Sequence, residues 1–191
     1  MSKVVVFTNL SLDGVMQAPG RPDEDRRGGL EHGGWAAPYA AMTSAGRSIA
    51  TNGALLLGRR TYEDFYTVWP NRTDNPFTAV LNNTQKYVAS TTLSEPLPWI
   101  NSTLLKGDAA EAVARLKEEL DKDLVIMGSG ELVQSLMRAN LIDEYVLLIH
   151  PLVLGSGRRL FPEGSAFATL RLVDTKTTTT GVVIATYTAT H

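Results

Sequence analysis

Short apolar runs alternate with amphipathic stretches through most of this chain, and that alternation constrains its fold more than any other feature. Runs such as 54–58 (ALLLG) and 124–127 (LVIM) have the length and character of strands that are covered on both faces. Segments such as 59–69 and 131–141 carry apolar residues near helical spacing. Strands that alternate with helices build a mostly parallel sheet with helices on both faces. We therefore expect one α/β domain over residues 1–191.

The remaining segments extend this pattern. Residues 170–189 are rich in threonine and valine around Gly181, which predicts a two-stranded hairpin and hence an antiparallel C-terminal edge. Asp108, with Glu111 three residues later, predicts the N-cap of a helix over 108–123. The other expected elements are strands within 3–14, 86–91, 102–107 and 143–155, and a helix over 35–53.

Composition excludes several classes of function. Lysine plus arginine number 18 against 20 aspartate plus glutamate, so the chain has no global basic field to attract nucleic acid or an anionic membrane. It has no cysteine, which excludes disulfides, thiolate metal sites and cysteine nucleophiles. No stretch approaches the length of a membrane span, and the N-terminal apolar run is too short for a secretion signal. We expect a cytoplasmic protein.

The segment 15–34 (VMQAPGRPDEDRRGGLEHGG) reads as a long loop rich in glycine, proline and charge. Loops of this length in compact domains are usually either functional or disordered. The sequence alone leaves both readings open.

Gly128-Ser129-Gly130 forms a turn between an apolar run and a helix. Small residues let the backbone approach a ligand, and the free N–H groups of a helix start attract phosphate oxygens. The signal is weak by itself, because Val133 stands where a full dinucleotide fingerprint has its third glycine. Glu131 would also repel a phosphate unless its side chain turns outward. An ordinary strand-to-helix corner is the alternative.

A second turn of this kind occurs at Gly58. Arg59 and Arg60 follow it with the bidentate geometry that suits phosphate, and Thr61 adds a hydroxyl at a helix start. An exposed basic pair beside an N-cap threonine is the alternative. Two such turns in one α/β chain favour a dinucleotide, which presents more than one phosphate.

A third candidate is Asp13, in the stretch SLDG after the first strand. Ligands of parallel sheets bind at the carboxyl ends of the strands, so Asp13 is placed to reach a substrate, although an Asp-Gly turn is a common structural feature. His32, His150 and His191 show no metal-ligand spacing, so we expect no metal site. No G-x-S-x-G motif points to a serine hydrolase.

Taken in order, these segments resemble the dihydrofolate reductase-like superfamily. They are most similar to the reductase domain at the C-terminus of the riboflavin-biosynthesis protein RibD and to its stand-alone bacterial relatives. Four stretches carry the resemblance: SLDG (11–14), LLLGRRTYEDF (55–65), VIMGSGELVQSLM (125–137) and LIDEYVLLIHPLVLGSGRRLF (141–161).

The resemblance implies a three-layer αβα dihydrofolate reductase-like fold and a reductase that takes hydride from NADPH. Its substrate would be a small heterocyclic or carbonyl compound, as in 5-amino-6-(5-phosphoribosylamino)uracil reductase. Asp13 would orient this substrate or assist proton delivery, and the loop with Trp35 and Tyr39 would close over it. The adenosine and pyrophosphate of the cofactor would contact Gly58, Arg59, Arg60 and Thr61. The pyrophosphate would also contact Gly128, Ser129, Gly130, Glu131 and Leu132, and the 2′-phosphate would contact Ser90 and Thr91. The nicotinamide would contact Thr8, Asn9 and Met16.

The chain departs from its relatives at two positions. Met42 falls near the place of the acid of dihydrofolate reductases, and Met127 stands where riboflavin-pathway reductases usually carry an acid. The missing acids favour one alternative, a nucleotide-binding or assembly protein without catalysis. The third reading is a true dihydrofolate reductase, and the methionine at position 42 argues against it. The resemblance also implies a homodimer, in which the apolar run 145–155 could form a shared face as well as core.

Overall fold

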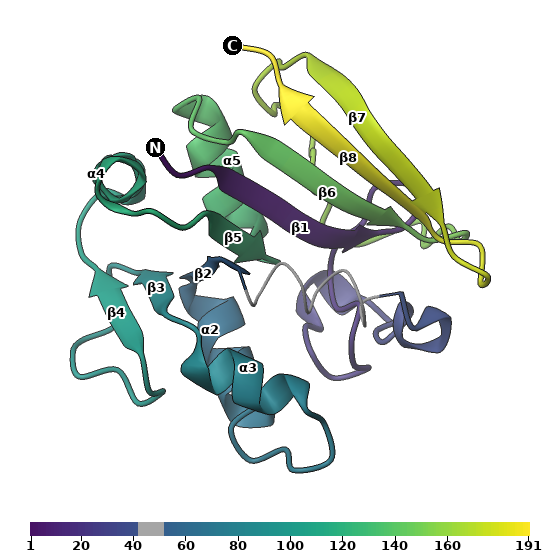
Figure 1. Ribbon diagram of the computed structural model, residues 1–191. Helices are drawn as coiled ribbons and strands as arrows, with labels where there is room; N and C mark the ends of the chain where they lie inside the picture. The colour runs from purple at the N-terminus through teal and green to yellow at the C-terminus, as the bar shows by residue number, and fades with distance from the viewer. Residues whose placement is uncertain (42–51) are drawn as a thin grey trace.

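The computed structural model describes residues 1–41 and 52–191, which build an eight-stranded sheet (Figure 1). The strands are β1 (Val4–Leu10), β2 (Ala54–Gly58), β3 (Lys86–Ala89), β4 (Ser102–Leu105), β5 (Leu124–Met127), β6 (Glu144–Ile149), β7 (Leu170–Thr177) and β8 (Val183–Ala189). Their order across the sheet is β4-β3-β2-β5-β1-β6-β8-β7. Neighbouring strands from β4 to β6 are parallel, whereas β8 and β7 are antiparallel to their neighbours, as the sequence predicts.

Helices cover both faces of the sheet, which confirms the three-layer expectation (Figure 1). The helices α4 (Ala109–Glu119) and α5 (Gly130–Arg138) lie on one face, and α2 (Arg59–Val68) and α3 (Phe77–Asn83) lie on the other. Because side chains alternate along a strand, β1 sends Val4 and Val6 to the α4–α5 core and Val5 and Phe7 to the α2–α3 core. Within the described ranges, no helix has the length and apolar character needed to cross a bilayer.

Several element boundaries follow from local chemistry. Asp108 is the N-cap of α4, and its carboxylate accepts a hydrogen bond of 2.9 Å from the Glu111 N–H, as predicted. The long strand expected over 143–155 is wrong in extent, because β6 ends at Ile149, just before His150-Pro151. Proline has no N–H to donate to a strand ladder. The first part of the apolar run, residues 145–148, is buried between β1 and β8 and belongs to the core.

The expectation of a helix over 35–53 is wrong at its start. Residues Ala37–Tyr39 form a short 3-10 turn, η2, which ends at Ala40 in a left-handed conformation. A non-glycine residue with positive φ ends a right-handed helix. Residues 42–51 lie outside the described part of the chain. The helix α3 was not predicted, because the polar segment that contains it lacks a clear apolar period.

Asp143, from the L-[VI]-D-E motif, connects three elements. Its Oδ2 accepts hydrogen bonds from the Val4 N–H at 2.7 Å and from the ammonium of Lys117 at 2.6 Å. The Lys117 side chain is 11% exposed and the Asp143 side chain 27%. This carboxylate therefore attaches the start of β1 and the end of α4 to the start of β6.

Replacing Asp143 with alanine should lower the free energy of unfolding by about 1–3 kcal/mol, because it leaves a partly buried ammonium and a backbone N–H without their acceptor. Urea denaturation measures the change. The matched control is Asp74→Ala, which removes an exposed pair with Arg72 and should cost less than about 0.5 kcal/mol. Equal effects of the two substitutions would contradict the assigned role.

Candidate cofactor and substrate site

A cleft of about 2170 Å³ opens at the carboxyl ends of β1, β2, β3 and β5. This is larger than the roughly 300–1,000 Å³ of common single-ligand sites. All fourteen residues that the sequence assigns to the cofactor line it: Thr8, Asn9, Met16, Gly58, Arg59, Arg60, Thr61, Ser90, Thr91, Gly128, Ser129, Gly130, Glu131 and Leu132.

The two glycine turns are joined by one hydroxyl group. Ser129 Oγ accepts a hydrogen bond from the Gly58 N–H at 2.9 Å and donates one to Thr61 Oγ1 at 2.9 Å. The contact is possible because β2 and β5 are neighbours in the sheet, and Ser129 has a left-handed φ of 59°. The starts of α2 and α5 therefore face the same space.

Neither helix start is capped by a side chain. Gly58 precedes α2 and Ser129 precedes α5, and among the described residues no side chain accepts a hydrogen bond from the first N–H groups of either helix. A Cβ atom at Gly130 would lie 2.9 Å from the sulfur of Met16, so Met16 packs directly on the first residue of α5. Free N–H groups and the positive ends of two helix dipoles thus meet in one cleft, a setting that attracts an anion.

Three arginines surround Glu131 at the same place. Its Oε1 lies 3.5 Å from Arg158, 3.8 Å from Arg60 and 3.9 Å from Arg27, measured to a guanidinium nitrogen in each case. The Glu131 side chain is 80% exposed, so it turns outward as a phosphate site requires. Nη1 of Arg27 is buried and has no hydrogen-bond partner in the described part of the chain. Arg27 is also paired with Asp25 at 2.6 Å, so these three guanidinium groups face two carboxylates and leave one net positive charge.

Arg27 and Arg158 were missed by the sequence reasoning. They come from the loop after β1 and from the segment after β6, far apart in the chain. Each belongs to an Arg-Arg pair next to glycine, Arg26-Arg27-Gly28 and Gly157-Arg158-Arg159, as in Gly58-Arg59-Arg60. This shared pattern is the sequence signal that could have identified Arg27 and Arg158 as residues of the site.

The two sides of the cleft, after β3 and at β1, differ in how their polar side chains are hydrogen-bonded. Ser90 follows β3, and its Oγ accepts hydrogen bonds from the N–H groups of Thr92 at 3.1 Å and Leu93 at 3.0 Å. Asn9 lies on β1, two strands away from β2, and its side-chain Oδ1 is buried with no hydrogen-bond partner among the described residues. An unpaired buried amide oxygen is costly, which makes Asn9 a candidate ligand contact.

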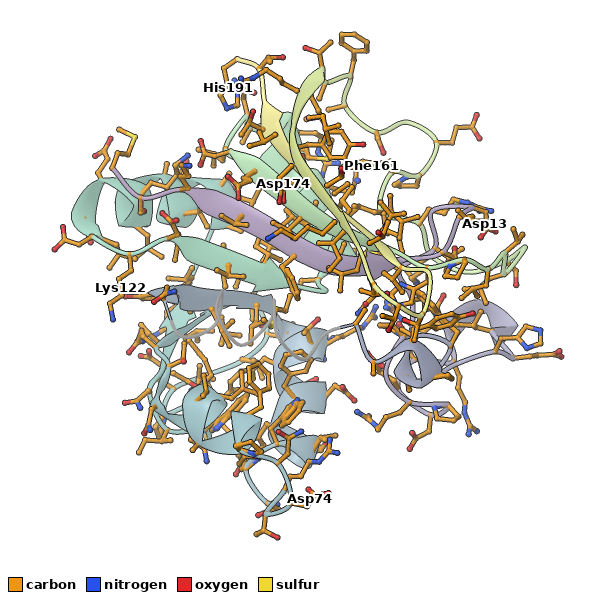
Figure 2. All side chains as sticks on the ribbon, turned by 45° about the vertical axis from the view of Figure 1, so that its right-hand side comes forward. Asp13, Asp74, Lys122, Phe161, Asp174 and His191 are labelled. Carbon is orange, nitrogen blue, oxygen red and sulfur yellow. The ribbon has the colours of Figure 1, made fainter. Side chains whose placement is uncertain are left out.

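Asp13 does not line the cleft, so its expected role at the substrate is not supported by its position. Its carboxylate accepts hydrogen bonds from Ser11 Oγ at 2.6 Å, the Leu154 N–H at 3.1 Å and the Gly155 N–H at 2.8 Å. Arg159 lies 3.6 Å away. The hydrogen bonds, that from Ser11 first, lower the pKa of Asp13 to about 2. Asp13 joins the loops that follow β1 and β6 (Figure 2).

Trp35 and Tyr39 also lie outside the lining, contrary to expectation. Both rings meet His150 edge-on with centroid distances of 5.3 Å, and the Trp35 indole N–H donates to the Gln17 carbonyl at 2.8 Å. Successive side chains of this short turn point in different directions, so Ala36, Ala37 and Ala40 face the cleft instead. His150 is fully buried, and burial lowers its pKa.

The long loop after β1 packs along the cleft. Arg21 donates to both oxygens of the Asp64 carboxylate, at 2.5 and 3.3 Å, and so connects the loop to α2. Gln17 donates through its amide to the carbonyls of Asp25 and Arg27.

Of the two methionines at departures from the relatives, Met127 is buried at the end of β5 and lines the cleft, whereas Met42 lies outside the described residues. No three His, Asp or Glu side chains of the described part come close enough to hold a metal ion.

Comparisons with known proteins agree with this geometry. The sequence matches the model of the RibD C-terminal domain over residues 2–184. It is 31% identical to the uncharacterized protein YwjB of Bacillus subtilis over 181 residues, which is 91% of each chain. A putative riboflavin biosynthesis protein of Shewanella sp. PV-4 superposes with a TM-score of 0.70 at 22% identity over 99% of both chains. Dihydrofolate reductase of Enterococcus faecalis, complexed with NADP(H), superposes with a TM-score of 0.58 at 15% identity, over 99% of this chain and 97% of its own.

The layers, strand order and relatives define a dihydrofolate reductase-like α/β protein. Within that class, the chain belongs to the RibD C-terminal domain family.

The structural role of Asp13 predicts a pH-dependent effect of Asp13→Ala. The folded-state pKa of about 2 lies below the ordinary value of 3.8, so Asp13 contributes stability above pH 3.8 and loses it as the pH falls through 2. The variant should be less stable than the parent at pH 7, by about 1–3 kcal/mol, and the difference should shrink toward pH 2. Urea denaturation at several pH values measures this. A difference that is constant with pH would argue against a stabilising carboxylate.

Proposed function

We propose that this protein is a cytoplasmic NADPH-dependent reductase that resembles 5-amino-6-(5-phosphoribosylamino)uracil reductase and acts on a small heterocyclic or carbonyl substrate. One observation carries the proposal. Two uncapped helix starts are joined through Ser129 and lie beside an excess of arginine charge in a cleft of dinucleotide size. Arginine binds phosphate in a bidentate manner, and helix starts add N–H donors.

The strand order supports one orientation of the cofactor. Its pyrophosphate would lie over the middle of the cleft, at Gly58 and Gly128, where β2 and β5 end. The 2′-phosphate and adenosine would extend toward Ser90 and Thr91 after β3. The nicotinamide would extend the other way, toward Asn9 on β1. When bound, this ring supplies hydride to an electrophilic carbon of the substrate.

The chain's own residues would bind the cofactor phosphates, orient the nicotinamide or substrate, and shield the helix start from water. Arg27, Arg60 and Arg158 would neutralise phosphate charge, and Glu131 would hold these three guanidinium groups at the cleft before the cofactor arrives. The Asn9 amide would orient a polar edge of the nicotinamide or substrate. Met16, packed on Gly130, would exclude water from the helix start.

Cofactor affinity tests the proposal. NADPH should quench protein fluorescence or gain fluorescence itself on binding, with saturation below millimolar concentration. Arg60→Ala and Arg158→Ala should each raise the dissociation constant about tenfold, since a charge-assisted contact is worth about 1.5–3 kcal/mol before compensation by neighbours. The control is Arg171→Ala, an exposed arginine on β7 at the far edge of the sheet. Absence of saturable binding would refute the proposed function.

Turnover separates this proposal from a nucleotide-binding protein without catalysis. Met127, an apolar residue at the cleft in the position of an acid, is the observation that favours the second candidate. Oxidation of NADPH, followed by absorbance with pyrimidine, pterin and carbonyl compounds, decides between them. Turnover of a dihydropterin that is blocked by antifolates would instead indicate a dihydrofolate reductase.

We also propose that the protein forms a homodimer through β7. This strand is the open edge of the sheet, and its side chains Leu172 and Val173 are 52% and 54% exposed. If two copies pair antiparallel about Thr175, Asp174 of each copy faces Lys176 of the other, which is a favourable cross-strand pair.

The dimer is tested with Leu172→Arg, which should convert it to a monomer in light scattering coupled to size exclusion, because charge on an apolar contact opposes association. Ile100→Arg is the matched control, since Ile100 is an exposed aliphatic residue just before β4 at the opposite edge. A monomeric parent, or a variant with the same mass as the parent, would contradict β7 pairing.

A further inference from the structure

Glu24 differs from the other carboxylates that line the cleft. The seven others are Asp25, Glu63, Asp64, Asp74, Asp108, Glu131 and Glu163. Six of these are bound by arginines or, for Asp108, cap a helix, and Glu163 is exposed. Glu24 is partly buried, and no cation lies within ion-pair distance of it in the described part of the chain.

The Glu24 carboxyl group is held in place by backbone. Its Oε2 accepts hydrogen bonds from the Gly20 N–H at 2.7 Å and the Arg21 N–H at 3.2 Å. The other oxygen, Oε1, makes no hydrogen bond to the described residues and is free to meet a ligand. A fixed carboxyl with one free oxygen is the geometry that directed proton transfer needs.

The charged groups around Glu24 keep it from being neutralised by a cation. Arg21, its neighbour in the loop, is engaged by both oxygens of Asp64 on α2 and lies 3.4 Å from Asp23. The negative charge of Asp64 also acts on Glu24. Burial, the largest cause, together with this charge, raises the pKa of Glu24 above its ordinary value.

In the proposed orientation of the cofactor, the nicotinamide would extend toward β1, the strand from which the loop with Glu24 begins. The pyrophosphate site lies over β2 and β5, and the loop with Glu24 follows β1, on the opposite side from β3. Arg21 fixes this loop to Asp64, five residues beyond the start of α2 and hence about 7.5 Å along that helix. The carboxyl group, which accepts from the Arg21 N–H, is thus held beside a part of α2 beyond the helix start that would bind phosphate.

We propose that Glu24 is the proton donor of the reductase, an inference that rests on the proposed function. When bound, the dihydronicotinamide would supply hydride to the electrophilic carbon of a C=N, C=C or C=O group and would itself be oxidised to the pyridinium form. The π electrons of that double bond would move to its other atom. The Glu24 O–H bond breaks as its proton joins this atom. The substrate is reduced, Glu24 is left as a carboxylate, and water returns the proton to it.

The Glu24 titration tests this placement without any substrate. Protein labelled with ¹³C at glutamate carboxyl carbons is titrated by NMR, and Glu24→Gln identifies the Glu24 signal. One sample is saturated with NADP⁺ and another with the acid-stable 1,4,5,6-tetrahydronicotinamide analogue, whose ring is uncharged. The midpoint should lie above 4.5 with the analogue and about 0.5–1 pH unit lower with NADP⁺, because the positive ring favours a nearby carboxylate. Equal midpoints, or midpoints at or below 4.5 in both complexes, would overturn the proposal.

Activity supplies the second readout. With an acceptor that the protein turns over, Glu24→Gln should reduce kcat about 100-fold and leave the dissociation constant of NADPH within about twofold. Glu118→Gln, the same substitution at an exposed residue of α4 that does not line the cleft, should leave both unchanged. Unchanged kcat in Glu24→Gln would refute the role of Glu24 while the reductase stands. Failure of the parent to bind NADPH would instead refute the proposed function and this inference with it.

Discussion

The hydroxyl of Ser129 sets the geometry on which the candidate site depends. It accepts from Gly58 and donates to Thr61, so two helix starts that are about 70 residues apart in sequence are held at hydrogen-bond distance. Each helix start alone is a weak attractor of anions. Together they form one uncapped face, since the hydroxyl that could have capped α5 is used between the turns. The arginines around Glu131 then add charge to a surface that the backbone has already prepared.

The wall opposite this face is formed by loops, and carboxylates fix them to the sheet and helices. Asp13 holds the segment after β6 through Leu154 and Gly155, and Asp64 holds the loop after β1 through Arg21. Asp143 likewise holds the start of β1 and the end of α4, through the Val4 N–H and the Lys117 ammonium. In each case the carboxylate bridges segments that are distant in sequence, and an ion or N–H donor compensates its charge. One further carboxylate on these loops, Glu24, accepts only N–H groups of its own loop, and no cation of the described residues lies within ion-pair distance of it. This is why we assign it a chemical role.

Particular residues show where sequence reasoning succeeds. Gly58 and Asp108 mark helix starts through their own backbone freedom and hydrogen-bonding capacity, so the starts of α2 and α4 could be placed to within a residue or two. The predicted end of α4 at residue 123 lies four residues beyond its observed end at Glu119. Asp13 shows where it fails. An aspartate after a strand lies at the ligand-binding edge of the sheet, but whether its carboxylate turns toward the cleft or toward Leu154 depends on a segment some 140 residues away. The prediction that Trp35 and Tyr39 face the cleft fails for the same reason, because both rings pack edge-on against His150, more than 100 residues away in the sequence.

The sequence by itself determined the alternation of strands and helices, the antiparallel edge and the two glycine turns, because these depend on periodicity and on the conformational freedom of single residues. Only the tertiary structure decided which charges meet. Arg27, Arg60 and Arg158 come from three separate segments, and Glu24 differs from the other cleft carboxylates only through what surrounds it. Electrostatic environment is a property of distances in space, and chain order does not contain those distances until the sheet has brought the segments together.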